Sequence, residues 1–185
     1  IAQNQAMSGT ADTGATVWMH NNFLVDRTGK MSKSGGEFLR LQTLIDRGFH
    51  PLSYRLMCLQ AHYRSELEFS WANIAAAQTR LKRLVQTVAG LRDRPATSAT
   101  GTTDAYRDRL DAAIADDLNT SKALPVLDEL LADKRIAPAD RLAALVDVDA
   151  VLGLDLLVLT REDLRIRPAA ATIDEDAVAA RLVER

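Results

Sequence analysis

The longest amphipathic segment of the chain, residues 70–91, places the strongest limit on the fold. Ser70 is a favoured N-cap residue, and apolar side chains recur after it at the spacing of a helix. These side chains are Trp71, Ile74, Ala77, Leu81, Leu84, Val85 and Val88. The pattern predicts one long helix with a continuous apolar face.

Three more helical patterns follow this segment after a small, polar connection at residues 95–103. We expect Pro125 to kink the second, and Pro138 and Gly153 to begin and end the third. The predicted ranges are 104–117, 120–133 and 138–152. Their lengths and short connections predict an antiparallel helical bundle. Residues 154–159 are apolar and fit either a strand or a turn.

The elements expected before the long helix are shorter. One β-favouring run, residues 22–26, precedes a turn at residues 26–29. The expected helices are residues 1–8, 12–20 and 37–47, and a further helix that starts at Pro51. The sequence opens at Ile1 within one helical pattern and ends within another that begins at residue 174, so we expect a fragment of a longer protein.

Composition excludes several protein classes. The chain has 185 residues, of which 47% are hydrophobic and 26% charged, as in globular domains. Cys58 is the single cysteine, so an internal disulfide and a cysteine-based zinc cluster are excluded. We interpret it as a core thiol. The sequence contains neither an apolar run of membrane-spanning length nor a signal peptide pattern, so we expect a cytoplasmic protein without a membrane partner.

Charge is distributed unevenly along the sequence. Up to Pro95 there are 12 Lys and Arg residues against 7 Asp and Glu, whereas the remainder has 11 against 18. The first part is therefore the better candidate for contact with a polyanion, although scattered solvated charges explain the counts equally well. The same two interpretations hold for Arg80 and Arg83 on the long helix.

Residues 30–36, here called the lysine loop, read Lys-Met-Ser-Lys-Ser-Gly-Gly. Lysine ammonium groups, serine hydroxyls and glycine-rich backbone amides can together hold phosphate. The same residue types also form ordinary surface turns, and the spacing is not that of a P-loop. The loop alone therefore leaves both interpretations open.

The neighbouring residues carry a resemblance to a known family. Residues 18–26 read Trp-Met-His-Asn-Asn-Phe-Leu-Val-Asp, residues 62–65 read His-Tyr-Arg-Ser, and residues 116–120 read Asp-Asp-Leu-Asn-Thr. Together with the lysine loop, these segments resemble cysteinyl-tRNA synthetases, which are class I aminoacyl-tRNA synthetases. The resemblance covers nearly the whole chain.

This resemblance implies a mainly α fold, in which the end of a Rossmann-type catalytic domain, with a short strand and the lysine loop, precedes an antiparallel α-helical bundle. The implied domains are residues 1–66, the C-terminal part of the catalytic domain with its stem-contact helices, and residues 67–185, a truncated tRNA-binding bundle. The implied activity is ATP-dependent activation of cysteine and its transfer to tRNA-Cys. A fragment of this kind is not expected to be active alone.

The resemblance also implies roles for single residues. Lys33 is expected to neutralise charge that develops while cysteine attacks ATP, with Lys30 assisting. The implied ATP-binding residues are His20, Lys30, Met31, Ser32, Lys33 and Ser34. The implied tRNA-binding residues are Arg64, Arg80 and Arg83.

The implied cofactors and partners are ATP with Mg²⁺, L-cysteine and tRNA-Cys, and the protein is expected to be a monomer. Zinc belongs to the family, but its ligands would precede Ile1. We therefore expect no metal ligands here, and His20, His50 and His62 lack metal-site spacing. Gly35 and Glu37 differ from the family pattern after the lysine loop, which leaves the conformation of that loop open.

Two alternatives remain. A related ligase of mycothiol biosynthesis shares the loop but transfers cysteine to an amino-sugar, and the basic long helix argues against it. A non-catalytic tRNA-binding module is the second alternative, and the intact lysine loop argues against that.

Overall fold

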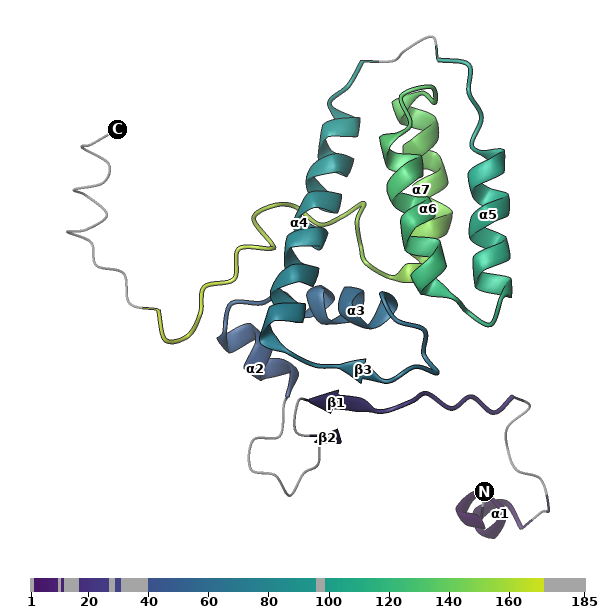
Figure 1. The fold of residues 1–185 in the computed structure, drawn as a ribbon, viewed down its shortest axis with the longest axis vertical. Helices are drawn as coiled ribbons and strands as arrows, with labels where there is room; N and C mark the ends of the chain where they lie inside the picture. The colour runs from purple at the N-terminus through teal and green to yellow at the C-terminus, as the bar shows by residue number, and fades with distance from the viewer. Residues whose placement is uncertain are drawn as a thin grey trace.

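The computed structural model describes residues 2–9, 11, 17–26, 29–30, 40–95 and 99–171. These residues are mainly helical, as expected (Figure 1). The helices are α1 (Ala2–Ser8), α2 (Leu41–Asp46), α3 (Pro51–Leu59), α4 (Trp71–Arg92), α5 (Asp104–Ala115), α6 (Thr120–Ala132) and α7 (Pro138–Leu152). The strands are β1 (Leu24–Asp26), β2 (Gly29–Lys30) and β3 (Leu67–Glu68).

Helix α4 has the predicted buried face and packs against α3 and α7. The Ser70 hydroxyl accepts a hydrogen bond from the backbone N–H of Asn73 at 3.1 Å, which confirms the predicted N-cap. Every residue of the predicted stripe after Trp71 is buried. From Leu81 onward the stripe joins a core shared with α5, α6 and α7, which includes Leu110, Leu127 and Leu145.

The bundle helices closely match the predicted ranges. Helix α5 ends two residues earlier than expected, Pro125 lies inside α6, and Gly153 follows α7 with a φ of 60°. The connection from α5 to α6 lies at the lower end of the bundle in Figure 1, and the connection from α6 to α7 at its upper end. Residues 156–158 form a turn, which resolves the choice left open for that apolar segment.

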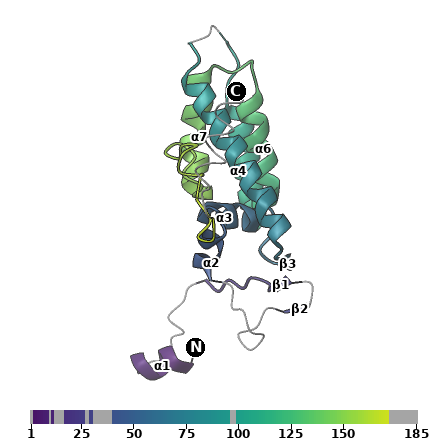
Figure 2. The ribbon, with the colours of Figure 1, turned by 90° about the vertical axis from the view of Figure 1, so that its left-hand side faces the viewer.

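Beneath the bundle lies a small sheet in the order β2-β1-β3 (Figure 2). Strand β1 pairs antiparallel with β2, with Asp26 opposite Gly29, so the pairing flanks the predicted turn. It pairs in parallel with β3, with Leu24 opposite Leu67. Helices α2 and α3 make the connection that two parallel strands require.

A second core joins this sheet to the helices. Leu44 of α2, Met57 of α3 and Phe69 after β3 are buried together with Ile74 and Ala77 of α4. Leu24 of β1 and Leu67 of β3 pack against this junction core. The junction core therefore fixes the sheet, α2 and α3 against the first turns of α4.

The helix predicted over residues 12–20 is wrong in its described part. Residues 17–20 are non-helical and exposed, and the chain continues without regular structure to β1. Asn22 donates its backbone N–H to the Tyr63 carbonyl oxygen at 2.8 Å, which holds this segment beside the start of β3. The pairing with a distant backbone replaces the local hydrogen bonds that a helix would have used.

The predicted helix over residues 37–47 is confirmed only from Leu41 onward. Arg40 has extended backbone angles at the N-cap, and residues 37–39 lie outside the described residues. Gly48 ends the helix as expected, with a φ of 85° that favours glycine. The helical pattern predicted from residue 174 also lies outside the described residues.

After α7 the chain turns back across the helices. Arg92 of α4 donates to the Leu157 carbonyl oxygen, and Ala169 donates its backbone N–H to the Asp46 carbonyl oxygen of α2 at 2.8 Å. Figure 1 shows this segment crossing from the bundle towards α2. The end of the described chain therefore contacts the helix that follows the lysine loop.

Candidate ATP and tRNA site

The structure places the two ends of the lysine loop. Lys30 lies in β2 with its backbone opposite Val25, and the described chain resumes at Arg40, directly before α2. The implied ATP-binding residues Met31, Ser32, Lys33 and Ser34 lie outside the described residues. Their roles remain predictions, and so does the side-chain role of Lys30.

Both ends of the loop are attached to the junction core. On one side, β1 contributes Leu24, and the Val25 carbonyl oxygen accepts the Phe69 backbone N–H at 2.7 Å. On the other side, α2 contributes Leu44, which is only 2% exposed. The junction core therefore holds the elements on both sides of the loop.

Aromatic rings extend this support to the start of α4. Trp71 stacks with Phe49 and meets Phe69 edge-on, with ring centroids 6.0 and 5.3 Å apart. The guanidinium carbon of Arg47 lies 3.9 Å from the centre of a Trp71 ring, within the range of a cation–π contact. Arg47, which caps the C-terminus of α2, is therefore directed towards α4.

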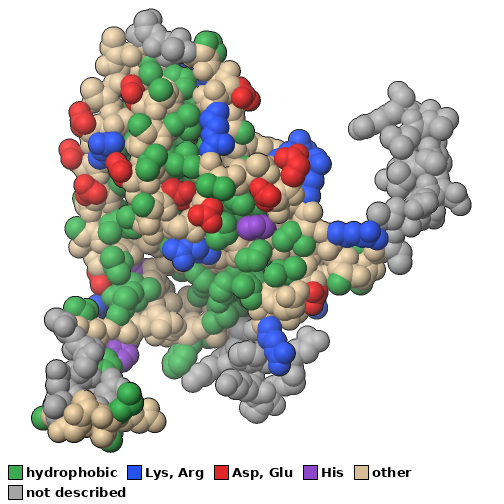
Figure 3. All heavy atoms as spheres, turned by 180° about the vertical axis from the view of Figure 1, so that it is seen from behind, with side chains coloured by type: hydrophobic (Ala, Val, Ile, Leu, Met, Phe, Trp, Pro, Cys, Tyr) green, Lys and Arg blue, Asp and Glu red, His purple; other side chains and the backbone are tan. Residues whose placement is uncertain are grey.

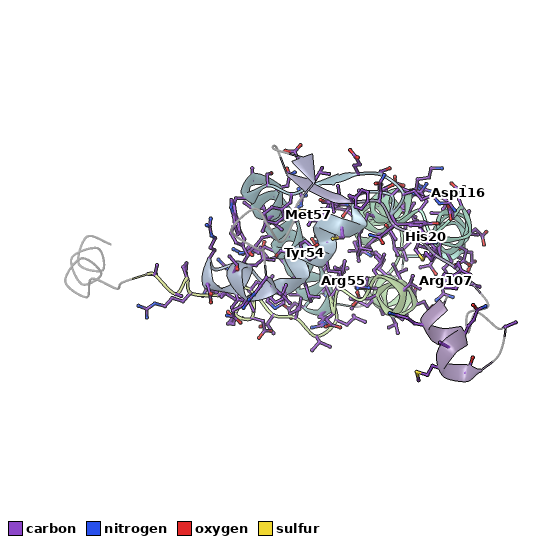
Figure 4. The ribbon with its side chains drawn as sticks, turned by 90° about the horizontal axis from the view of Figure 1, so that it is seen from below. His20, Tyr54, Arg55, Met57, Arg107 and Asp116 are labelled. Atoms are coloured by element: carbon purple, nitrogen blue, oxygen red, sulfur yellow. The ribbon has the colours of Figure 1, made fainter. Side chains whose placement is uncertain are left out.

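His20 is exposed in the segment before β1 (Figure 4). Its neighbours Val17, Trp18 and Met19 expose large apolar surfaces, as does Phe23. The predicted contact of His20 with ATP remains a prediction.

Arg64 lies at a junction between the sheet and the bundle. Its Nε lies 3.0 Å from Oδ2 of Asp117, which belongs to the connection between α5 and α6. Tyr63 donates its hydroxyl to Oδ1 of the same carboxylate at 2.6 Å, and His62 Nε2 lies 3.1 Å from the Asp117 carbonyl oxygen. The Tyr63 hydroxyl and the Asp117 carboxylate raise the pKa of Arg64. Arg64 is two-thirds exposed, so it also remains accessible to a tRNA phosphate.

The Asp117 connection has an uncommon backbone. Asp117 and Leu118 both have positive φ angles, of 54° and 55°, although neither is glycine. Left-handed geometry costs a residue with a side chain roughly 1–2 kcal/mol. Such geometry persists where surrounding contacts enforce it. Here the Leu118 and Asn119 amides bond back to α5, and Thr120 donates its hydroxyl to the Leu59 carbonyl oxygen of α3 at 2.9 Å.

The two predicted tRNA contacts on α4, Arg80 and Arg83, differ in exposure and in salt-bridge pairing. Arg80 is mostly buried and bonded to Asp128 of α6 at 2.6 Å. Arg83 is exposed next to Lys82, and among the described residues neither has a salt-bridge partner. Basic and acidic side chains are intermingled over the bundle in Figure 3, so the described face is not one continuous basic surface.

The remaining candidate groups have structural roles. His50 caps α3 by accepting the Leu52 backbone N–H at Nδ1, and burial lowers the pKa of its imidazole. Burial raises the pKa of the Cys58 thiol and, with Cys58 nearby, raises the pKa of Tyr54 to about 12. A thiol that resists ionisation is a poor nucleophile, although Cys58 is only partly buried and lies outside the core clusters of the described residues, so the core role expected for it is not confirmed. The described residues contain no cluster of side chains suited to a metal ion.

Sequence reasoning missed Asp117 as a partner of Arg64 and Tyr63. The segment containing Asp117 belonged to the family resemblance, but nothing in the local sequence indicated which residues it would meet. The left-handed backbone was also unforeseen, because aspartate adopts it in only a minority of cases and leucine rarely. In the described part of the chain no helix is long and apolar enough to span a membrane.

Comparison with known proteins shows which family the sequence resembles. A model for the catalytic domain of class I (C) tRNA synthetases matches residues 1–79. Cysteine–tRNA ligase of Novosphingobium aromaticivorans is 57% identical across the whole chain, which covers 39% of that relative. The enzymes of the same name from Zymomonas mobilis and Treponema denticola are 46% and 34% identical, again across the whole chain, which covers 43% and 41% of them.

The chain thus spans about two fifths of the length of these curated relatives. The matched domain runs from α1 into α4 and includes both ends of the lysine loop. Similarity to the ligases continues through the bundle and the Asp117 connection. The chain belongs to the cysteinyl-tRNA synthetase family of class I aminoacyl-tRNA synthetases.

Proposed function

We propose that residues 1–185 are part of a cysteine–tRNA ligase. The observation that carries the proposal is 57% identity to such a ligase over the whole chain, in a segment that retains the lysine loop sequence. In the proposed reaction the cysteine carboxylate attacks the α-phosphorus of ATP, and pyrophosphate leaves. A hydroxyl at the 3′ end of tRNA-Cys then attacks the carbonyl carbon of the adenylate, and AMP leaves.

Lys33 is the proposed stabiliser of the first transition state. Negative charge grows on the phosphates as pyrophosphate departs, and an ammonium group directed at it lowers the barrier. Lys30, Met31, Ser32 and Ser34 would shape the loop around ATP, with His20 nearby. The junction core holds the elements on both sides of the loop, and this supports the proposal because it keeps the loop at one place on the protein.

We propose different roles for the two parts of the chain. Residues 1–66 would complete a Rossmann-type catalytic domain, and residues 67–185 would form an antiparallel bundle that binds tRNA. Arg83 is the strongest proposed phosphate contact, since it is exposed and among the described residues has no salt-bridge partner. Arg64 would contact tRNA while it holds Asp117. Mg²⁺ would accompany ATP, and zinc would use residues outside this sequence.

The proposal is tested in the full-length protein that contains this chain. Lys33→Ala is expected to slow cysteine-dependent exchange of pyrophosphate into ATP by roughly 10² to 10³-fold, because one electrostatic stabiliser is lost. Lys82→Ala removes a lysine of the same charge from α4 and serves as the matched control, with exchange unchanged. A loss of less than about threefold for Lys33→Ala contradicts the proposed role of this lysine.

Charging assays separate the two alternative functions. A cysteine–tRNA ligase transfers cysteine to tRNA-Cys, whereas the mycothiol-pathway relative would form the adenylate and leave tRNA uncharged. A binding module would bind tRNA in a salt-dependent way without ATP turnover. Identity to named cysteine–tRNA ligases over both parts of the chain favours the first outcome.

A further inference from the structure

Residues 62–64 contact two different parts of the molecule through two different sets of atoms. Their backbone faces β1: the carbonyl oxygens of Tyr63 and Arg64 accept the backbone and side-chain N–H groups of Asn22 at 2.8 and 3.0 Å. Their side chains face the bundle, where all three meet Asp117. This short segment therefore connects the strand that leads to the lysine loop with the lower end of the bundle.

The contacts on the bundle side converge on one carboxylate. Tyr63 donates to Oδ1 of Asp117, Arg64 pairs with Oδ2, and the Arg64 Nε also donates to the Tyr63 hydroxyl at 2.9 Å. The His62 and Tyr63 rings stack with centroids 4.9 Å apart. We call the side chains of Tyr63, Arg64 and Asp117 the latch.

The latch contacts the bundle at the connection between two of its helices. Asp117 lies in the connection where α5 ends and α6 begins, marked in Figure 4 by the neighbouring Asp116. Both helices therefore follow any movement of this connection relative to β1. The left-handed backbone at Asp117 directs its carboxylate at residues 63 and 64, and the Thr120 hydroxyl adds a contact to α3.

The latch orients the connection between α5 and α6 and adds little to the free energy of folding. The side chains of Arg64 and Asp117 are 67% and 43% exposed, and exposed ion pairs contribute little to folding because solvent screens them. The burial that stabilises the bundle lies in its own core, away from these groups. Loss of the latch should therefore leave the protein folded, because the junction core still holds the sheet against α4, while the connection between α5 and α6 becomes free to shift relative to residues 62–64.

We propose that Asp117 is a positioning residue that orients the tRNA-binding bundle relative to the lysine loop through Tyr63 and Arg64. This inference rests on the proposed function. Adenylate formation needs only the small substrates and the loop, whereas the transfer step needs a tRNA bound to the bundle to present its 3′ end at the adenylate. The latch therefore acts on the second step, for which a small misplacement of a reacting group is costly.

The test uses the full-length protein and Asp117→Asn. Asparagine tolerates the left-handed backbone, so the change removes the charge and keeps the local geometry. We expect single-turnover transfer from a preformed adenylate to tRNA to slow by about three- to thirtyfold. Cysteine-dependent ATP–pyrophosphate exchange and the KM for tRNA should each change by less than about twofold.

Two further variants make the test specific. Tyr63→Phe removes the hydroxyl at the other side of the latch and should produce the same separation of the two steps, with less than additive effects in the double variant. Asp116→Asn removes a neighbouring carboxylate of the same connection, whose partner is Lys122 at 2.7 Å, and should leave both steps unchanged. Thermal unfolding should shift by less than about 4 °C in all three.

Equal losses in both steps, no loss in transfer, or an equal effect of Asp116→Asn would each overturn the proposal. Failure of the proposed function gives a different result, because the wild-type protein would then show no cysteine-dependent exchange or no charging. The wild-type assays therefore separate the two failures before any variant is compared.

Discussion

The bundle buries its apolar side chains, whereas the segment before β1 exposes them. Leu81, Leu127 and Leu145 of the bundle are completely buried, whereas Val17 and Trp18 are 81% and 50% exposed. The bundle helices thus find their partners within this chain. The segment before β1 is held by hydrogen bonds to a distant backbone, such as that from the Asn22 N–H to the Tyr63 carbonyl oxygen, while Val17 and Trp18 stay exposed. Side-chain burial therefore holds the bundle together, whereas backbone pairing holds the segment before β1.

The largest effect that tests this comparison comes from the bundle core. Leu127→Ala should lower the free energy of unfolding by about 2–5 kcal/mol, because it leaves a cavity among fully buried neighbours. Trp18→Ala removes a larger side chain but should change the same free energy by less than about 0.5 kcal/mol. Urea unfolding of both variants measures the difference. Similar losses would show that the segment before β1 is also part of a stabilising core.

A smaller effect is expected where the sheet meets the bundle. Ser70→Ala removes the side-chain acceptor at the start of α4 and should cost about 1 kcal/mol. Thr103→Ala is the matched control, since Thr103 precedes α5 without a side-chain capping bond. Urea unfolding gives the free energies, and amide exchange at Asn73 reports the lost cap. Equal costs for the two variants would contradict the capping role of Ser70.

The smallest effect concerns pH at the junction core. Burial raises the pKa of Tyr54 from 10.0 to about 12. The folded protein therefore keeps this phenol protonated where the unfolded chain ionises it, so stability present below pH 10 is lost as pH rises to about 12. Unfolding free energies across this range should fall less steeply for Tyr54→Phe than for the wild type. Identical slopes would contradict the assignment, and partial exposure keeps the effect small.

The same contrast explains what could be predicted from the sequence. The bundle helices were predicted closely because their limits are set by local residues such as Ser70, Asn119, Pro138 and Gly153, and their faces by periodic apolar side chains. These signals lie within each helix.

Prediction failed where distant contacts decide the backbone. Residues 17–20 have a composition compatible with a helix, yet Asn22 pairs with Tyr63 and the chain runs on to β1 without regular structure. At Asp117 the left-handed backbone depends on contacts with residues far away in the sequence. The candidate site combines both kinds of region, which is why its sequence motif was visible and the latch was not.

The parallel pairing of β1 with β3 also determines the order in which the molecule can assemble. Strand β1 precedes α2 and α3 in the chain, but its partner β3 follows them. Ribosomal synthesis therefore completes both helices before β1 can pair with β3. Helical contacts between near neighbours form quickly, whereas pairing between distant strands is slow. The parallel pairing of β1 with β3 is thus expected to form late, after the helices that lie between the two strands in the chain.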